Sequence, residues 1–250
     1  MCIVNFEQLL INYEFGKQEV LRAIEAAQKG YICVSDGVVL NIANRDPEYL
    51  KVVNGSMFSI CDSSWVPLYL KSIYGVRYEQ YCGSEIFKDI VASRKYRMIF
   101  LGTSKQTLEG LRRELSKMNP DVVDMQFVEL PFRIVEDFDY PEIAKMVESD
   151  GAKIIWVALG APKQEKFMNL LLPHLNQGVM IGVGAAFKFF SGIDESWCPE
   201  WMHKCHVEFI YRIMQAPKKQ LTRCLGILWT LPRLYLGEVK RAIRGNNGNR

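Results

Sequence analysis

Short apolar segments that recur with one helical segment between them constrain the fold of this chain most strongly. Most of these segments are apolar at consecutive positions, which is typical of strands covered on both faces. The six predicted strands cover residues 31–34, 57–61, 98–101, 124–128, 154–159 and 179–183. Helical patterns are predicted at residues 17–29, 46–53, 66–73, 85–93, 105–118, 140–149 and 162–172. This alternation predicts an α/β fold, a Rossmann-like and mostly parallel sheet with helices on both faces.

The charge distribution separates the last fifth of the chain from the rest. Residues 201–250 hold ten Lys or Arg and two Glu, whereas residues 1–200 hold 21 basic and 26 acidic residues. From residue 207 the pattern predicts a helix, a second helix after Pro217, and a last amphipathic piece after Pro232. We therefore predict a catalytic α/β domain over 1–200 and a basic helical appendage over 201–250 that associates with an anionic membrane surface. A helix packed on the core is the alternative.

Other classes of protein are disfavoured by what the sequence lacks. The first 15 residues do not resemble a secretory signal, and the apolar stretches are too short to span a bilayer, so a cytoplasmic protein is expected. The seven cysteines are scattered without a CxxC pair, and His203 and His206 have no carboxylate or cysteine pair to complete a metal site. We therefore expect no metal and no cofactor. Nucleic-acid binding is disfavoured because the basic tail alternates with leucines instead of exposed stacking aromatics.

Glycine or small polar residues follow most of the predicted strands. In parallel sheets, ligands bind beyond the carboxyl ends of the strands, where loops and helix N-termini meet. The candidate ligand-binding residues at this edge are Asp36, Gly102, Thr103, Gly160 and Gly184. A phosphorylated ligand fits such an edge because helix N–H groups attract anions. The alternative is that small residues simply make tight turns between strand and helix.

Two polar features at the same edge suggest chemistry. Lys163, Gln164 and Glu165 follow Pro162 at the start of a predicted helix and are candidate substrate-binding residues, although a solvated first helical turn has a similar composition. Asp62 directly follows an apolar strand, where a carboxylate facing a cleft can act as a general base. The alternative for Asp62 is a cap on the following helix.

Several short segments stand in a fixed order along the chain. They are DPE at 46–48 leading to Asp62, GSE at 83–85, FLG at 100–102, GAPKQE at 160–165, GVGAAF at 182–187, PEWM at 199–202 and EFIYR at 208–212. Taken together, they resemble the WecG/TagA/CpsF family of glycosyltransferases. The resemblance runs from about residue 15 to about residue 225, and GAPKQE is its most specific feature.

The resemblance implies an inverting, metal-independent glycosyltransferase. Such an enzyme moves a sugar, often N-acetylmannosamine or its uronic acid, from a UDP donor to an undecaprenyl-diphosphate-linked sugar at the cytoplasmic membrane face. By this likeness Asp62 matches the general base and Gln164 an amide of the sugar-nucleotide pocket. Arg212, Lys219 and Arg223 match tail positions that reach the diphosphate. The expected partners are therefore the donor, the polyprenyl-linked acceptor and an anionic membrane, with a homo-oligomer left open and no nucleic acid.

This sequence departs from the family pattern at several donor-side and rim positions. Ser63 replaces a Gly after the base, Asp36 an Asn, and Lys188 the acid after the GVGxxF element; Trp197 and the GSE segment also differ. Two alternatives follow: a related hexosyltransferase, for example glucosyl, acting on a longer lipid-linked oligosaccharide, or a degenerate nucleotide-binding protein without activity. The pathway, capsule or exopolysaccharide synthesis, stays open.

Overall fold

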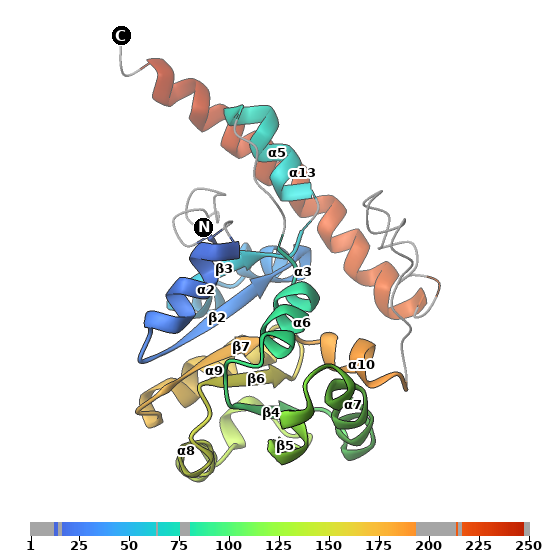
Figure 1. Ribbon diagram of the computed structural model, residues 1–250. Helices are drawn as coiled ribbons and strands as arrows, with labels where there is room; N and C mark the ends of the chain where they lie inside the picture. Colours follow the sequence, from blue (N-terminus) through green and yellow to red (C-terminus); the bar gives the residue numbers. More distant parts are fainter. Residues whose placement is uncertain are drawn as a thin grey trace.

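Seven parallel strands form one sheet at the centre of the molecule. The computed structural model describes residues 13–14, 17–63, 65–75, 81–193, 214 and 217–247. The strands are β1 (Tyr13–Glu14), β2 (Lys29–Ser35), β3 (Phe58–Cys61), β4 (Met98–Gly102), β5 (Gln126–Val128), β6 (Ile154–Ala158) and β7 (Gly178–Gly182). Their order in the sheet is β1-β3-β2-β7-β6-β4-β5, and every neighbouring pair is parallel (Figure 1).

Helices follow almost every strand and cover both faces of the sheet. The α-helices are α2 (Lys17–Ala26), α3 (Gly37–Ala43), α4 (Pro47–Asn54), α5 (Trp65–Tyr74), α6 (Gly83–Ser93), α7 (Lys105–Met118), α8 (Tyr140–Asp150), α9 (Lys163–Leu171), α10 (Ala186–Ser191) and α13 (Pro217–Asn247). The described residues also form the short 3-10 helices η1 (Pro120–Asp124), η2 (Val135–Asp137) and η3 (Leu172–His174). The Rossmann-like α/β fold expected from the sequence is thus confirmed.

Alternate side chains of each central strand enter different halves of the core. In β2, Ile32 and Val34 pack with α2, α6, α7 and α10, whereas Tyr31 and Cys33 pack with α8 and α9 on the opposite face. This is the two-residue period of a strand, applied to a sequence that is apolar at every position. A third cluster joins α3, α4 and α5 to α13 beside the carboxyl end of β3.

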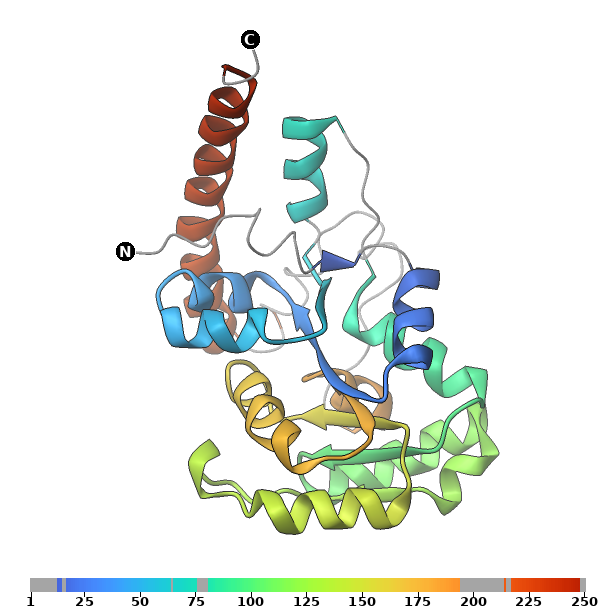
Figure 2. The same cartoon turned by 90° about the vertical axis from the view of Figure 1, so that its left-hand side faces the viewer.

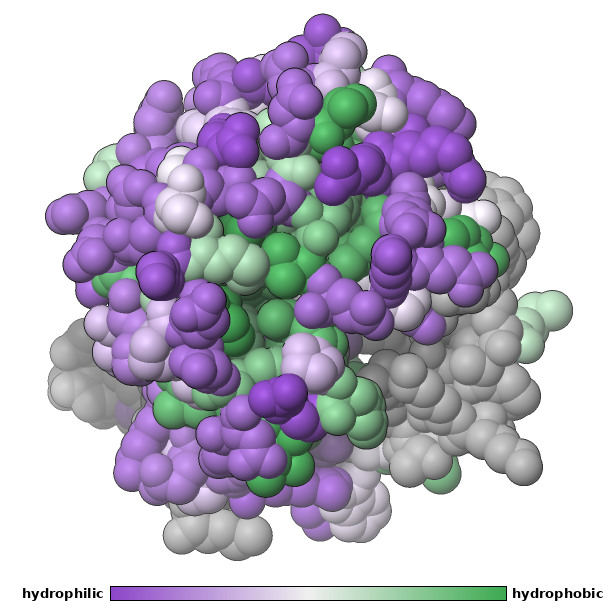
Figure 3. Space-filling view, turned by 90° about the horizontal axis from the view of Figure 1, so that it is seen from below, coloured by the Kyte–Doolittle hydropathy of each residue, from purple (hydrophilic) through white to green (hydrophobic). Residues whose placement is uncertain are grey.

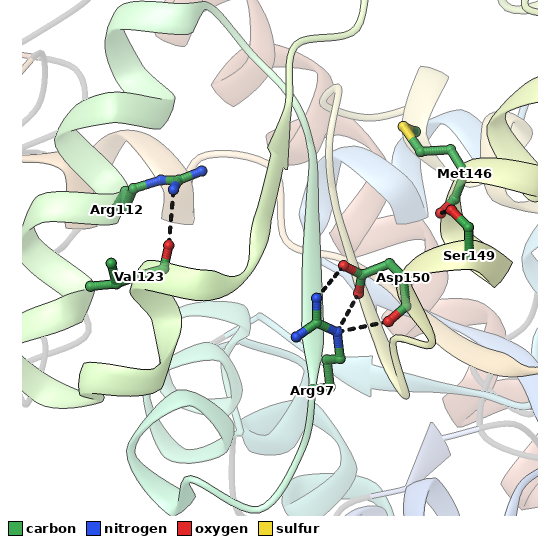
Figure 4. Close-up of polar contacts among 6 residues, drawn as sticks. All are labelled: Arg97, Arg112, Val123, Met146, Ser149 and Asp150. Atoms are coloured by element: carbon green, nitrogen blue, oxygen red, sulfur yellow. Dashed lines mark hydrogen bonds and ion pairs between the residues drawn. The ribbon is translucent and has the colours of Figure 1, made fainter.

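Side-chain contacts to the helices and connecting segments stabilise the half of the fold around β4. Arg97, just before β4, binds Asp150 at the end of α8 with Nε 3.0 Å from Oδ1 and Nη2 2.7 Å from Oδ2 (Figure 4). Arg112 on α7 donates to the carbonyl of Val123 at 3.0 Å. Ser149 Oγ also donates to the Met146 carbonyl within α8. Figure 3, a view from below, shows a band of hydrophobic surface between hydrophilic side chains.

The structure differs from the sequence-based expectation in several elements, and the two-residue strand β1 was not predicted. Helices α3 and α10 were not predicted, because each is short and follows a strand after one or a few residues. Strand β5 begins at Gln126 instead of residue 124, since residues 120–124 form η1, whose first turn is capped by the Asn119 side chain.

Helix α13 is the largest correction. The sequence predicts an interruption at Pro232, but the helix continues through it to Asn247. A proline inside a helix costs about 3 kcal/mol, because it removes one hydrogen bond and crowds the preceding turn. Here Pro232 is exposed, so the freed Leu228 carbonyl can bind water, while the adjacent Leu231 is buried against α3. Packing on either side of the proline offsets its cost.

One face of α13 is fixed to the body of the molecule. Leu231 and Leu234 are 5% and 3% exposed, the Thr230 hydroxyl donates to Asn41 on α3, and the Tyr235 ring lies 4.9 Å from the Tyr69 ring on α5. Figures 1 and 2 both show α5 beside α13, with α13 extending past the sheet. Among the described residues, no helix is both long and apolar enough to cross a bilayer. The division into two domains at residue 200 stays a prediction.

Candidate active site

A cleft of about 260 Å³ opens where the carboxyl ends of five strands meet. Residues after β2, β3, β4, β6 and β7 and the first turns of the following helices line it. Of the residues singled out in the sequence, the cleft brings together Asp36, Asp62, Thr103, Gly160, Gln164 and Gly184. Segments more than 140 residues apart in the chain therefore contribute to one site, as expected of the carboxyl edge of a parallel sheet.

Asp62 is held at this edge by backbone groups of its neighbours. Its N–H donates to the Ser35 carbonyl at 3.1 Å, which ties the end of β3 to the end of β2. Its Oδ1 accepts from the Gly83 N–H at the first residue of α6, at 3.2 Å. A helix N-terminus favours a negative charge, so this contact orients the carboxylate and suits its charged form. Asp62 is only partly buried and lines the cleft, so its carboxylate is accessible to a ligand there.

Asp36, the second carboxylate of the cleft, has a local structural task. Its Oδ1 accepts from the N–H groups of Val38 and Val39 at 2.9 and 3.0 Å and so caps α3. Because an N-cap carboxylate is occupied by the first turn of its own helix, Asp36 is less available for proton transfer than Asp62.

Gly102 and Thr103 make the turn from β4 into α7. Both have positive φ, 115° for Gly102 and 57° for Thr103. A Cβ at Gly102 would lie 2.7 Å from the Ala158 carbonyl oxygen, so only glycine fits there. Gly102 itself stands behind the cleft lining, whereas Thr103 is part of it. A β-branched residue in the left-handed region is strained, and such strain is often found at functional sites.

The Gln164 side chain hydrogen-bonds to two backbone segments that line the cleft. Its Oε1 accepts from the Gly160 N–H at 3.1 Å, and its Nε2 donates to the Gly182 carbonyl at 3.2 Å. Nε2 also donates to Oε1 of Glu165 at 2.9 Å. Since the Gly182 carbonyl can only accept and the Gly160 N–H can only donate, the orientation of the amide is fixed. The side chain is 4% exposed and joins the β6–α9 turn to the end of β7.

Glu165 lies under Gln164 and does not reach the cleft lining. It is completely buried, and this burial raises the pKa of its carboxyl group from 4.5 to about 7, despite the opposing hydrogen bond from Gln164. Its Oε2 and the Tyr49 hydroxyl are both buried without a hydrogen-bond partner of good geometry among the described residues. Tyr49 also lowers this pKa, but less than the hydrogen bond from Gln164 does. Glu165 is therefore placed to hold Gln164, not to touch a ligand.

The remaining candidate cations are not part of the described cleft. The Lys163 Nζ lies 5.2 Å from the centroid of the Phe132 ring and 5.3 Å from that of Phe138, outside the lining. Arg212 falls outside the described residues. Lys219 and Arg223 lie on α13, and the structure does not describe their side chains. Their expected contact with a diphosphate stays a prediction.

Cys82 and Lys188 are among the side chains that line the cleft but were not predicted from the sequence as site residues. Burial is the main cause that raises the pKa of the Cys82 thiol, and the nearby Asp62 charge adds to it, so this cysteine is a neutral neighbour and a poor nucleophile. In the sequence, Lys188 stands out only as a departure from a family pattern, but its position soon after the β7 turn could have placed it at the cleft. Within the described part of the chain, no group of three or more His, Cys, Asp or Glu could hold a metal ion.

Known proteins similar to this chain are transferases that act on a lipid-linked sugar. An N-acetylglucosaminyldiphosphoundecaprenol N-acetyl-beta-D-mannosaminyltransferase of Bacillus subtilis (strain 168) is 26% identical over 217 residues, which cover 82% of each chain. Proteins with the same name from Bacillus spizizenii (strain ATCC 23059 / NRRL B-14472 / W23) and Staphylococcus aureus (strain MW2) are each 23% identical. The first match covers 82% of each chain, and the second covers 86% of this chain and 81% of the relative.

The family comparison agrees with the resemblance found in the sequence. Residues 2–246 match the model described as the glycosyl transferase WecG/TagA/CpsF family. This match covers nearly the whole chain, including every strand and almost every helical residue described above. The protein belongs to the WecG/TagA/CpsF family of glycosyl transferases.

Proposed function

We propose that this enzyme transfers a sugar from a UDP-sugar to a sugar linked to undecaprenyl diphosphate, with inversion at the anomeric carbon and without a metal. The observation that carries the proposal is that Asp62 and Gln164, which come from opposite halves of the chain, line one cleft in a member of this family. The relatives' names specify an N-acetylglucosaminyldiphosphoundecaprenol acceptor and an N-acetyl-β-D-mannosaminyl group. An N-acetylmannosamine-type donor is therefore the first to test.

In the proposed reaction, Asp62 takes the proton of the acceptor hydroxyl as its oxygen bonds to the anomeric carbon of the donor. The bond from that carbon to the diphosphate oxygen breaks at the same time, and UDP leaves with the electron pair. One displacement by one base inverts the anomeric centre. The Gly83 N–H keeps the Asp62 carboxylate in position. Cationic side chains hold the charge that develops on UDP.

Replacing Asp62 with Asn tests the role of the base. Asn keeps an oxygen that can accept from the Gly83 N–H, so the loop should keep its structure. We expect the rate of transfer to fall about 10²- to 10⁴-fold, the usual contribution of a general base, while UDP affinity stays near the wild-type value. The assay follows sugar transfer to a short-chain lipid diphosphate acceptor by mass spectrometry.

Asp46→Asn is the matched control, because Asp46 caps α4 outside the cleft lining and Asn is an equally good cap. Its transfer rate should equal that of the wild type. Full activity of Asp62→Asn would remove Asp62 from the mechanism. A wild-type protein that binds UDP but transfers no sugar from any donor tested would favour a degenerate binding protein instead. Transfer from UDP-glucose or another UDP-hexose in a donor panel would instead identify the related hexosyltransferase.

We also propose that α13 attaches the enzyme to the inner face of the cell membrane, where such an acceptor is found. Opposite its buried face, α13 carries an exposed apolar stripe: Leu225, Leu228, Trp229, Leu236 and Ile243 are 56–68% exposed. Arg233, Lys240 and Arg244 are exposed along one border of the stripe, and the Arg233 guanidinium lies 4.1 Å from the centroid of the Trp229 ring. An apolar stripe beside cations is typical of a helix that lies in the membrane interface.

Sedimentation with vesicles of mixed neutral and anionic phospholipid tests this proposal. Leu236→Glu places a charge in the middle of the stripe and should reduce the bound fraction several-fold. Val123→Glu makes the same kind of change at a residue that is 53% exposed on η1, and it should bind as the wild type does. Equal binding by all three proteins would contradict the proposal. If Leu236→Glu and the wild type differ in oligomeric mass in solution without lipid, the stripe instead contacts a second copy of the chain.

A further inference from the structure

Lys188 is the only lysine or arginine among the described residues that line the cleft. It lies on α10, directly after the β7 turn in which Gly184 has a φ of 50°. The neighbouring Phe187 is completely buried in the core, whereas Lys188 and Phe189 belong to the cleft lining. The packing of Phe187 therefore sets the rotation of α10 and directs Lys188 to the site.

The charges of the cleft show what Lys188 can do there. The two carboxylates of the lining, Asp36 and Asp62, are each held by backbone N–H groups, which keep them beside any ligand in the cleft. A nucleoside diphosphate brings about two further negative charges to the same space. Like charges repel strongly where water is partly excluded, so binding requires a positive charge close to the phosphates.

We propose that Lys188 binds the diphosphate of the nucleotide donor in this enzyme, an inference that rests on the proposed function. A lysine ammonium is a compact charge with three donors, which suits phosphate oxygens. Lys188 thereby shares the neutralisation of departing UDP with the cations expected from the tail.

Calorimetric titration of the full-length protein with UDP and with uridine tests the assignment, because uridine lacks the diphosphate. Replacing Lys188 with Met removes the charge and keeps most of the side-chain length. Loss of one charge-assisted hydrogen bond should weaken UDP binding about 10- to 100-fold and leave uridine binding unchanged. Lys188→Arg should recover most of the UDP affinity. The salt dependence of UDP binding should also be weaker in Lys188→Met.

Lys145→Met is the matched control, since Lys145 is exposed on α8 and is not part of the cleft lining. Its affinity for UDP should equal that of the wild type. Unchanged UDP affinity in Lys188→Met would overturn the inference, even if the transfer rate fell, because the lysine would then not bind the diphosphate. An equal loss of UDP and uridine affinity would also overturn it. A wild-type protein that binds no UDP would overturn the proposed function itself.

Discussion

Replacing Glu165 with Gln should remove a specific pH dependence from the stability of this protein. The Glu165 carboxyl group is completely buried, and its pKa is raised by burial from 4.5 to about 7. Its Oε1 accepts one hydrogen bond from Gln164, while Oε2 faces the region of the Tyr49 hydroxyl without a partner of good geometry among the described residues. Keeping this carboxyl group ionised in the folded protein therefore costs free energy.

The sign follows from the proton affinity of the two states. Between pH 4.5 and about 7 the folded protein holds a proton on Glu165 that the unfolded chain has lost, so the free energy of unfolding falls as pH rises. The shift from 4.5 to about 7 corresponds to roughly 3 kcal/mol. The cost is absent below pH 4.5, grows through the window and is complete above pH 7.

Urea unfolding of the wild type and of Glu165→Gln at pH 5, 6, 7 and 8 measures this cost. The introduced amide can still accept from Gln164 through its oxygen and can donate to the Tyr49 hydroxyl through its nitrogen, so the variant should fold. Relative to the wild type, its free energy of unfolding should rise by roughly 3 kcal/mol between pH 5 and pH 8. Any other group that changes its charge between pH 5 and pH 8 contributes equally to both proteins and cancels in the difference.

Glu142→Gln, a change at an exposed residue of α8, is the control and should follow the wild-type curve at each pH. The reasoning fails if Glu165→Gln and the wild type lose stability in parallel between pH 5 and pH 8. It also fails if the difference between them grows toward acid pH, since that would mean that the folded state prefers the charged carboxylate.

Two further predictions concern stability and are checked by thermal or urea unfolding. Thr103→Gly should stabilise the protein by about 1 kcal/mol, because it relieves the strain of a β-branched residue in the left-handed region. Gly102→Ala should destabilise the protein, because the new Cβ would lie 2.7 Å from the Ala158 carbonyl oxygen. A higher melting temperature for Gly102→Ala than for Thr103→Gly would contradict this. Leu234→Ala should lower the free energy of unfolding by about 2 to 5 kcal/mol, because it leaves a cavity at a buried position between α13 and α3. Leu236→Ala, at an exposed position two residues away, should change it by less than about 0.5 kcal/mol. Equal effects of the two substitutions would mean that α13 is not packed as described.

Strands β2, β3, β4, β6 and β7 were predictable because a buried parallel strand is apolar at consecutive positions, whereas the two-residue strand β1 was not predicted. Helix α3 was not predictable by periodicity, because its seven residues are too few to show a helical period and its apolar residues resemble a continued strand. Its cap, Asp36, was visible, but the same residue also fits a ligand-binding edge. The predicted break at Pro232 was wrong because the local sequence indicates only the free-energy cost of a proline in a helix. It does not show the packing of Leu231 and Leu234 that offsets this cost.

The members of the candidate site were predictable as a group, but the direction of each side chain was not. Lys163, Gln164 and Glu165 are consecutive, so on a helix they point about 100° apart. The packing of α9 on the sheet decides which of them faces the cleft. Gln164 does, Glu165 enters the core, and Lys163 lies against Phe132 and Phe138. No rule based on the sequence alone contains that rotation.

Helix α13 is connected to the cleft through α3. The buried face of α13 is fixed on α3 by Leu231, Leu234 and the Thr230–Asn41 contact, and the N-cap of α3 is Asp36, which lines the cleft. Rotation of α13 about its axis would expose those leucines, so the direction of its exposed stripe is set relative to the cleft. If that stripe lies on a membrane, the cleft is held in one orientation to the lipid surface. A change at Thr230 should then reduce transfer to a membrane-embedded acceptor more than transfer to a short, water-soluble one.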